Sequence, residues 1–125
     1  MSSDQVILHF GNDSLLTEAR IRVLEDAGYE VVAADTQADV LRFLRSRLVS
    51  LVVACHSVPP DELESAVQQI KRLKPRIPVM IVHVGGLVRP QRSRADGFID
   101  GLRGPEHMLF QVASIITRNT TAAAS

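Results

Sequence analysis

The residues best suited to chemistry in this chain lie where short apolar runs end. Cys55 is the only cysteine, and it closes the run "LVVAC" with His56 directly behind it. His83 stands near the end of the run "IPVMIVHV", and Asp13 follows the run "VILHF" closely. A thiol, an imidazole and a carboxylate can form a nucleophile activated by an oriented base, and the same side chains bind zinc. The sequence therefore raises two hypotheses, a thiol-dependent site and a metal site at Cys55, His83 and Asp13.

Packing without chemistry is the alternative to both hypotheses. A lone buried cysteine often serves as a small apolar filler, and no tight zinc-motif spacing is present. His56 follows Cys55 directly, so strand alternation predicts that the two side chains point to opposite sides. We therefore expect His83, on a neighbouring strand, to be the imidazole that matters for Cys55. His9, inside the first apolar run, is expected to be a core histidine with one hydrogen-bond partner.

The elements that position these residues follow from an alternation of apolar runs and helical patterns. Strands are predicted at 6–10, 29–34, 51–55, 77–84 and, more weakly, 97–100. Helical spacing separates them, and in the first helix the predicted inward stripe is Leu15, Leu16, Ala19, Val23, Leu24 and Ala27. This alternation predicts an α/β domain of three layers, a parallel sheet with helices on both faces. Sites in such sheets lie at the carboxyl ends of the strands.

Composition limits the function classes. The 125 residues predict one domain over 1–118 and a flexible tail over 119–125. Fourteen basic residues balance 14 acidic ones and aromatic residues make up only 4%, which argues against nucleic-acid binding. No signal peptide or membrane span is expected. The single cysteine fits a reducing compartment, so a cytoplasmic location is predicted. No cofactor is expected.

Four segments together resemble the receiver domain of bacterial response regulators, the CheY-like fold. They are "VILHFGNDSLLTEARIRVLEDAGYEVVAA", "LVVACHSVPP", "IPVMIVHV" and "RADGFID". The resemblance extends from about Val6 to Arg118. It implies a doubly wound, flavodoxin-like sheet of five parallel strands in the order 2-1-3-4-5.

The resemblance also implies a set of phosphorylation residues, and this chain has replaced each of them. Receivers use two acids that hold Mg²⁺, an Asp that accepts the phosphoryl group, a Thr or Ser, and a Lys. At the matching positions this chain carries, in the same order, Gly11 and Asn12, Cys55, His83 and Gly101. Asp13 is the only carboxylate left nearby, and Phe98 keeps the place of the switch aromatic.

The segment between His83 and Phe98 is shorter than is usual in the family by about one helical turn. Two glycines and a proline interrupt it, so a shortened or missing fourth helix is expected. Three arginines in it, Arg89, Arg92 and Arg94, form a possible docking patch for an acidic partner.

Together these observations predict a degenerate receiver, or pseudo-receiver, of two-component (phosphorelay) type that is not an enzyme. It is expected to bind protein partners, either signalling proteins or a second copy of itself, without phosphorylation, and to bind neither nucleic acid nor membrane. Two alternatives remain open. One is the thiol- or metal-dependent site at Cys55/His83, and the other is a small-ligand sensor that uses an emptied pocket enlarged by Gly11 and Gly101.

Overall fold

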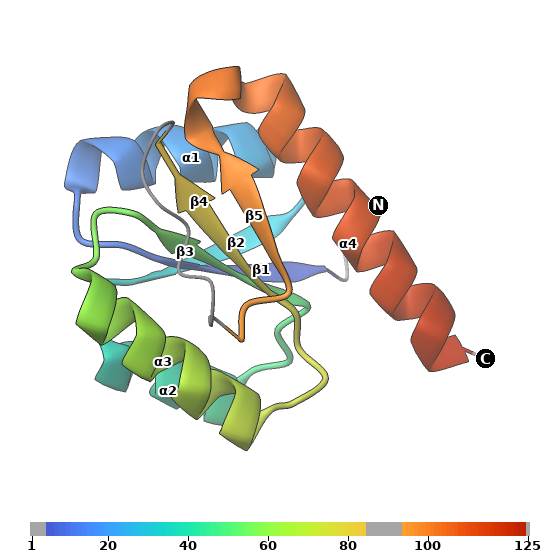
Figure 1. The fold of residues 1–125 in the computed structure, drawn as a ribbon. Coiled ribbons are helices and arrows are strands. Elements are labelled where there is room, and N and C mark those ends of the chain that lie inside the picture. Colours follow the sequence, from blue (N-terminus) through green and yellow to red (C-terminus); the bar gives the residue numbers. More distant parts are fainter. Residues whose placement is uncertain (1–4, 85–93, 125) are drawn as a thin grey trace.

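The chain folds into three layers around a five-stranded sheet (Figure 1). The structure, a computed structural model, describes residues 5–84 and 94–124. The strands are β1 (Val6–Phe10), β2 (Glu30–Ala34), β3 (Leu51–Cys55), β4 (Val79–His83) and β5 (Gly97–Asp100). The helices are α1 (Ser14–Asp26), α2 (Gln37–Ser46), α3 (Pro60–Leu73) and α4 (Pro105–Ala124), with a 3₁₀ turn η1 (Gly101–Arg103) after β5.

The sheet topology confirms the predicted fold class. Every paired strand runs parallel to its neighbour, and the order is β2-β1-β3-β4-β5. Helices α1 and α4 cover one face of the sheet, and α2 and α3 cover the other (Figure 1). All strands therefore end at one edge of the sheet, which we call the carboxyl edge.

Two apolar cores lie on either side of the sheet and show which layer each strand residue faces. Val53 and Val82 pack in the core under α1 and α4, whereas Val52 and Ile81 pack in the core under α2 and α3. Strand β3 is buried at all five positions, because it is central and has helices above and below. Alternation along each strand thus assigns every residue at the carboxyl edge to one layer or the other.

The helices begin where the sequence supplies a cap or a proline. The Oγ1 of Thr36 accepts a hydrogen bond of 3.1 Å from the amide of Asp39 and caps α2. Pro60 stands at the first position of α3, where its missing N–H costs nothing. Gly28, just after α1, has a φ of 101°, a left-handed conformation that suits glycine.

The last helix extends past residue 118, where the sequence predicted the domain to end. It continues to Ala124, because the run after Arg118 holds three alanines and no proline or glycine to stop a helix. The residues expected to form a shortened or missing fourth helix, 85–93, lie outside the described residues. None of the helices described is long and apolar enough to cross a membrane.

Candidate functional site

Cys55 lies at the centre of the carboxyl edge and is sealed from solvent. It ends β3, pairs in register with Val82 and has an exposed fraction of 0%. Its sulfur accepts a hydrogen bond from Arg20 Nη1 at 2.6 Å and one from the Ser57 amide at 3.5 Å. Reactive cysteines are usually partly exposed, so an incoming substrate cannot reach this thiol without a local opening.

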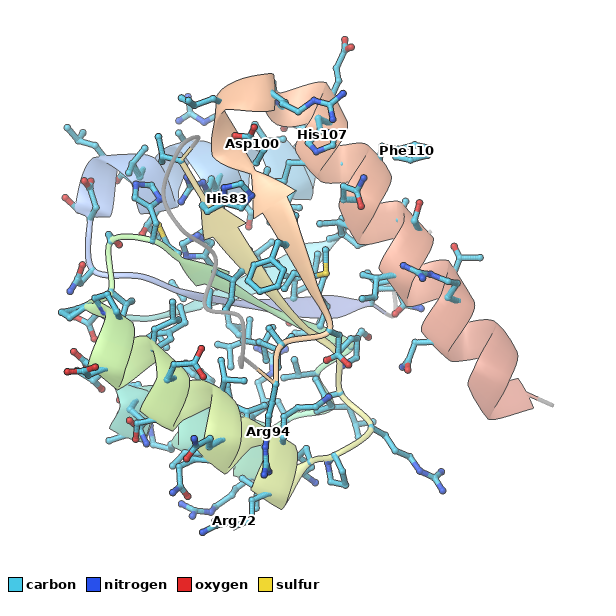
Figure 2. All side chains as sticks on the ribbon, viewed as in Figure 1. Arg72, His83, Arg94, Asp100, His107 and Phe110 are labelled. Carbon is cyan, nitrogen blue, oxygen red and sulfur yellow. The ribbon has the colours of Figure 1, made fainter. Side chains whose placement is uncertain are left out.

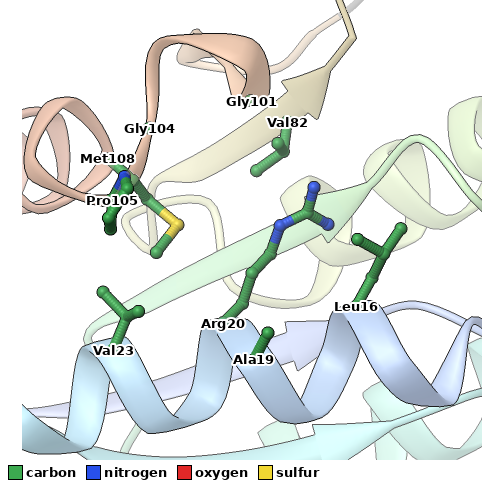
Figure 3. Close-up of a pocket in the computed structure, with 9 residues that line it drawn as sticks. All are labelled: Leu16, Ala19, Arg20, Val23, Val82, Gly101, Gly104, Pro105 and Met108. Atoms are coloured by element: carbon green, nitrogen blue, oxygen red, sulfur yellow. The ribbon is translucent and has the colours of Figure 1, made fainter.

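Arg20 is the site residue that sequence reasoning missed. It projects from α1 across the strand ends (Figure 3), and its Nη2 lies 3.4 Å from the position that a Cβ at Gly101 would take. The guanidinium therefore spans the distance from the end of β3 to the end of β5. A signal was present in the sequence, because Arg20 stands four residues after Leu16 and four before Leu24, inside the inward stripe of the helix.

The predicted orientation of His56 is wrong. Its Nδ1 lies 3.7 Å from Cys55 Sγ, on the same side as the thiol. His56 stands one residue beyond the end of β3, in a turn, so strand alternation no longer governs its direction. Burial, followed by the positive charge of Arg20, lowers the pKa of His56, while Asp13 acts in the opposite direction.

His83 lies on the other side of the sheet from Cys55. It has the same strand parity as Ile81, which packs in the core under α2 and α3, whereas Cys55 pairs with Val82 in the opposite layer. The His83 ring packs edge-on against Phe98, with centroids 6.5 Å apart. Its Nδ1 is buried without a hydrogen-bond partner among the described residues. The predicted pairing of Cys55 with His83 is therefore not formed.

The residues after β1 have structural roles, in a helix cap and in packing against the end of β3. Asp13 Oδ1 accepts a hydrogen bond of 3.1 Å from the Leu16 amide and caps α1. A Cβ at Gly11 would lie 2.9 Å from Cys55 Cβ, so the backbone at this position needs glycine for its close approach to β3. The Asn12 amide donates to Ser57 Oγ at 3.2 Å, which joins the loops after β1 and β3.

A metal centre gains no support from these positions. Across residues 5–84 and 94–124, no group of three or more His, Cys, Asp and Glu side chains is placed to hold a metal ion. Asp13 faces the first turn of α1 and His83 faces Phe98. The three side chains that sequence reasoning grouped as possible ligands thus point in different directions.

His9 is the fully buried polar residue beneath this edge. Its exposed fraction is 0%, and neither ring nitrogen has a hydrogen-bond partner in the part of the chain that the structure describes. The expectation of one partner was therefore wrong. Burial, together with the nearby charge of Arg20, lowers the pKa of His9 to about 4, so the ring is neutral at pH 7.

The two glycines that were expected to enlarge an emptied pocket both line cavities formed by described residues. Gly11 and Asn12 line one of about 350 Å³ beside β2, whereas Gly101 lines another of about 290 Å³ between α1 and α4. Only the second includes Arg20. The two glycines that were expected to enlarge one pocket therefore belong to different cavities.

The predicted docking arginines can be placed only in part. Arg94 is exposed (Figure 2), and Arg89 and Arg92 lie outside the described residues. Phe98 is half-buried in β5 against the core under α2 and α3. Leu102 of η1 and Phe110 of α4 are large apolar side chains with exposed fractions of 69% and 67%.

Comparison with known proteins supports the fold. No protein-family model matches this sequence, and no curated protein matches it significantly. Solved structures do match. A CheY-like response regulator receiver domain protein from Methanospirillum hungatei superposes with a TM-score of 0.84 at 20% identity, over 96% of this chain and 99% of that one.

Two further structures agree with the first. A putative response regulator from Chloroflexus aurantiacus gives a TM-score of 0.83 at 17% identity, over 92% of this chain and 99% of that one. A response regulator receiver domain protein from Clostridium thermocellum gives 0.81 at 18% identity, over 94% and 98%. The predicted fold is confirmed, and the chain has the CheY-like fold of response-regulator receiver domains.

Proposed function

We propose that this chain is a receiver-like signalling domain that has lost its phosphoacceptor site and acts as a phosphorylation-independent protein-interaction module. The observation that best supports this is the contact between Arg20 and Cys55. At the end of β3, where the fold's relatives keep a phosphoacceptor, a guanidinium caps a buried thiol at 2.6 Å. Position 55 carries no carboxylate nucleophile, and the Arg20 guanidinium occupies the space next to the Cys55 thiol.

The surroundings of Cys55 add to this argument. Phosphoryl transfer onto a carboxylate needs Mg²⁺ held by oxygen ligands. At the two positions that correspond to the acidic pair, Gly11 has no room for a side chain and Asn12 carries no charge. Asp13 remains, but its carboxylate caps α1. The proposal therefore includes loss of the metal site as well as loss of the acceptor.

A domain without the phosphorylation residues can still bind other proteins through its surface. Leu102 and Phe110 expose apolar surface on η1 and α4, and Phe110 points away from the sheet (Figure 2). Arg94 adds an exposed positive charge near the other end of β5. Signalling proteins or a second copy of this chain are the proposed partners, in the cytoplasm.

Incubation with acetyl phosphate and Mg²⁺, followed by intact-mass measurement, tests the proposal. No phosphoryl adduct is expected, while a phosphorylatable receiver treated in parallel should gain one. The variant Cys55→Asp provides the sharper test, because it restores the acceptor but not the metal ligands. It should also remain unmodified, and a Mg²⁺-dependent adduct on either protein would overturn the proposal.

The thiol-dependent alternative now rests on His56 and Arg20, because His83 faces away. Arg20 Nη1 and the Ser57 amide both donate hydrogen bonds to the sulfur. Complete burial of the thiol argues against this alternative, and the reaction of the folded protein with a disulfide reagent decides the matter. Slow labelling that becomes fast only on unfolding removes this alternative, whereas rapid labelling lost in Arg20→Gln would favour it.

A further inference from the structure

The cavity between α1 and α4 is a second place on this fold where a ligand could bind. It measures about 290 Å³, at the small end of the range for ligand pockets. Leu16 and Val23 of α1 form one wall, and Pro105 and Met108 of α4 form another (Figure 3). Val82 of β4 and Gly101 of η1 complete the lining at the strand ends. An apolar group of modest size suits these walls.

One positive charge lies in this apolar lining. Arg20 is the only ionisable side chain among the residues that form the cavity. In the part of the chain that the structure describes, its side chain makes a single hydrogen bond, to the sulfur of Cys55, and no ion pair with a carboxylate. A thiol is a weak acceptor, so most of the guanidinium's donor capacity is unused.

Gly101 and Arg20 line the same cavity, so the guanidinium borders its open volume. A Cβ at Gly101 would lie 3.2 Å from Val82 Cγ1 and 3.4 Å from Arg20 Nη2, so a larger residue there would press on the guanidinium. Guanidinium groups bind carboxylates with two parallel hydrogen bonds. A phosphate or sulfate would need more donors than one side chain and an apolar wall provide.

From these contacts we infer that the cavity binds a small organic carboxylate with an apolar tail. The carboxylate pairs with Arg20 beside Gly101, and the tail lies between Leu16, Val23 and Met108. The positive end of the α4 dipole, at Pro105, favours the same sign of ligand charge. Arg20 also contacts Cys55 in the proposed loss of phosphorylation, but ligand binding in this cavity and phosphorylation of position 55 are measured separately.

Binding is tested with three amphiphiles of equal chain length, octanoate, octanol and octylamine. Titrations followed by ¹H–¹⁵N correlation spectra should show octanoate shifting the amides of Ala19, Gly101 and Gly104 in a saturable way. A hydrogen bond to a charged group is worth roughly tenfold in affinity or more, so octanoate should bind at least about tenfold more tightly than octanol. Octylamine should bind most weakly of the three.

Three variants separate the charge from the cavity. Arg20→Gln should abolish the preference for octanoate over octanol, and Arg20→Lys should retain most of it. Ala19→Leu, at an exposed helical position that lines the cavity, should weaken both ligands. Arg22→Gln, two residues away on the exposed face of α1, is the matched control and should change neither.

The outcomes are distinct. Equal affinity for octanoate and octanol, shifts that map away from α1 and α4, or no binding of any of the three would each overturn the inference. A preference for octanoate that survives in Arg20→Gln would overturn the assigned role of Arg20. None of these results bears on phosphorylation by acetyl phosphate, so the two proposals can fail independently.

Discussion

The two edges of the sheet differ in how well their polar side chains are hydrogen-bonded. At the edge where β4 and β5 begin, one Asp96 oxygen accepts from Lys71 Nζ at 2.8 Å and from the Val79 amide at 2.7 Å. Lys71 also donates to the Ile77 carbonyl, and the Asp96 amide donates back to Val79. At the carboxyl edge, His9 and His83 keep ring nitrogens without partners among the described residues.

The difference indicates that one edge of the sheet stabilises the fold, whereas the carboxyl edge, which holds the candidate site, does so less. Buried polar groups without partners cost free energy, so a fold that keeps them at one edge must gain stability elsewhere. The Asp96 and Lys71 network, which ties α3 to the start of β4 and β5, provides such a gain. Each prediction below tests this contrast by disturbing one edge and comparing the result with the other.

The largest expected effect comes from placing an aspartate at position 11, at the carboxyl edge. Gly11→Asp should lower the free energy of unfolding by about 3 kcal/mol, because its Cβ would meet Cys55 and its charge would enter a buried place. Urea denaturation measures the loss. Asn12→Asp, at the exposed neighbour, is the control and should stay within about 0.5 kcal/mol. Equal effects at the two positions would contradict the close packing described at Gly11.

The next effect tests the opposite edge. Asp96→Ala should cost about 2.5 kcal/mol, because it removes one ion-pair partner and leaves the Val79 amide without its acceptor. Asp96→Asn keeps an oxygen acceptor and should cost clearly less. Asp26→Ala, an exposed acid at the end of α1, is the matched control with little expected change. A loss for Asp96→Ala no larger than the control's would remove the contrast between the edges.

Acid should weaken the protein through His9. The pKa of His9 is about 4 in the fold and 6.5 in an unfolded chain, so between these pH values the unfolded state binds the extra proton. Stability therefore falls as pH falls through this window, and His9 should contribute a loss of about 2 kcal/mol between pH 7 and pH 5.

The variant His9→Leu isolates that contribution. Its free energy of unfolding should fall less steeply from pH 7 to pH 5 than that of the unmodified protein, and His107→Gln, on α4, serves as the histidine control. Denaturant titrations at several pH values measure both slopes. An unchanged slope in His9→Leu would mean that His9 finds a partner for its proton in the fold.

The smallest effect is expected at Arg20. Among the described residues its side chain donates one hydrogen bond, to sulfur, so Arg20→Met should change the free energy of unfolding by no more than about 0.5 kcal/mol in the absence of ligand. Arg22→Met is the matched control on the same helix. Thermal and urea unfolding measure the difference. A large loss would show that Arg20 is a structural support of the carboxyl edge, as Asp96 is of the other.

Sequence reasoning located the strands well, because period and alternation depend on local patterns that the sheet preserves. The strand order came from the resemblance to receiver domains, and the sheet has that order. Sequence reasoning failed where the outcome depends on partners far along the chain. Leu15 has helical spacing but is 78% exposed, since none of the elements in residues 5–84 and 94–124 covers it.

The site was predicted less completely than the fold. The positions at the carboxyl edge followed from the topology, but the contacts of each side chain did not. His56 turns back toward Cys55 because the strand has already ended, and Arg20 reaches Cys55 from a helix 35 positions earlier in the chain. Neither fact is encoded in the spacing around Cys55 itself.

The close approach at Gly11 also constrains how this sequence can change over generations. An aspartate at 11 becomes tolerable only after Cys55 and His9 have made room. A single substitution at this position therefore gives a less stable protein, and the order in which these three positions can change is restricted.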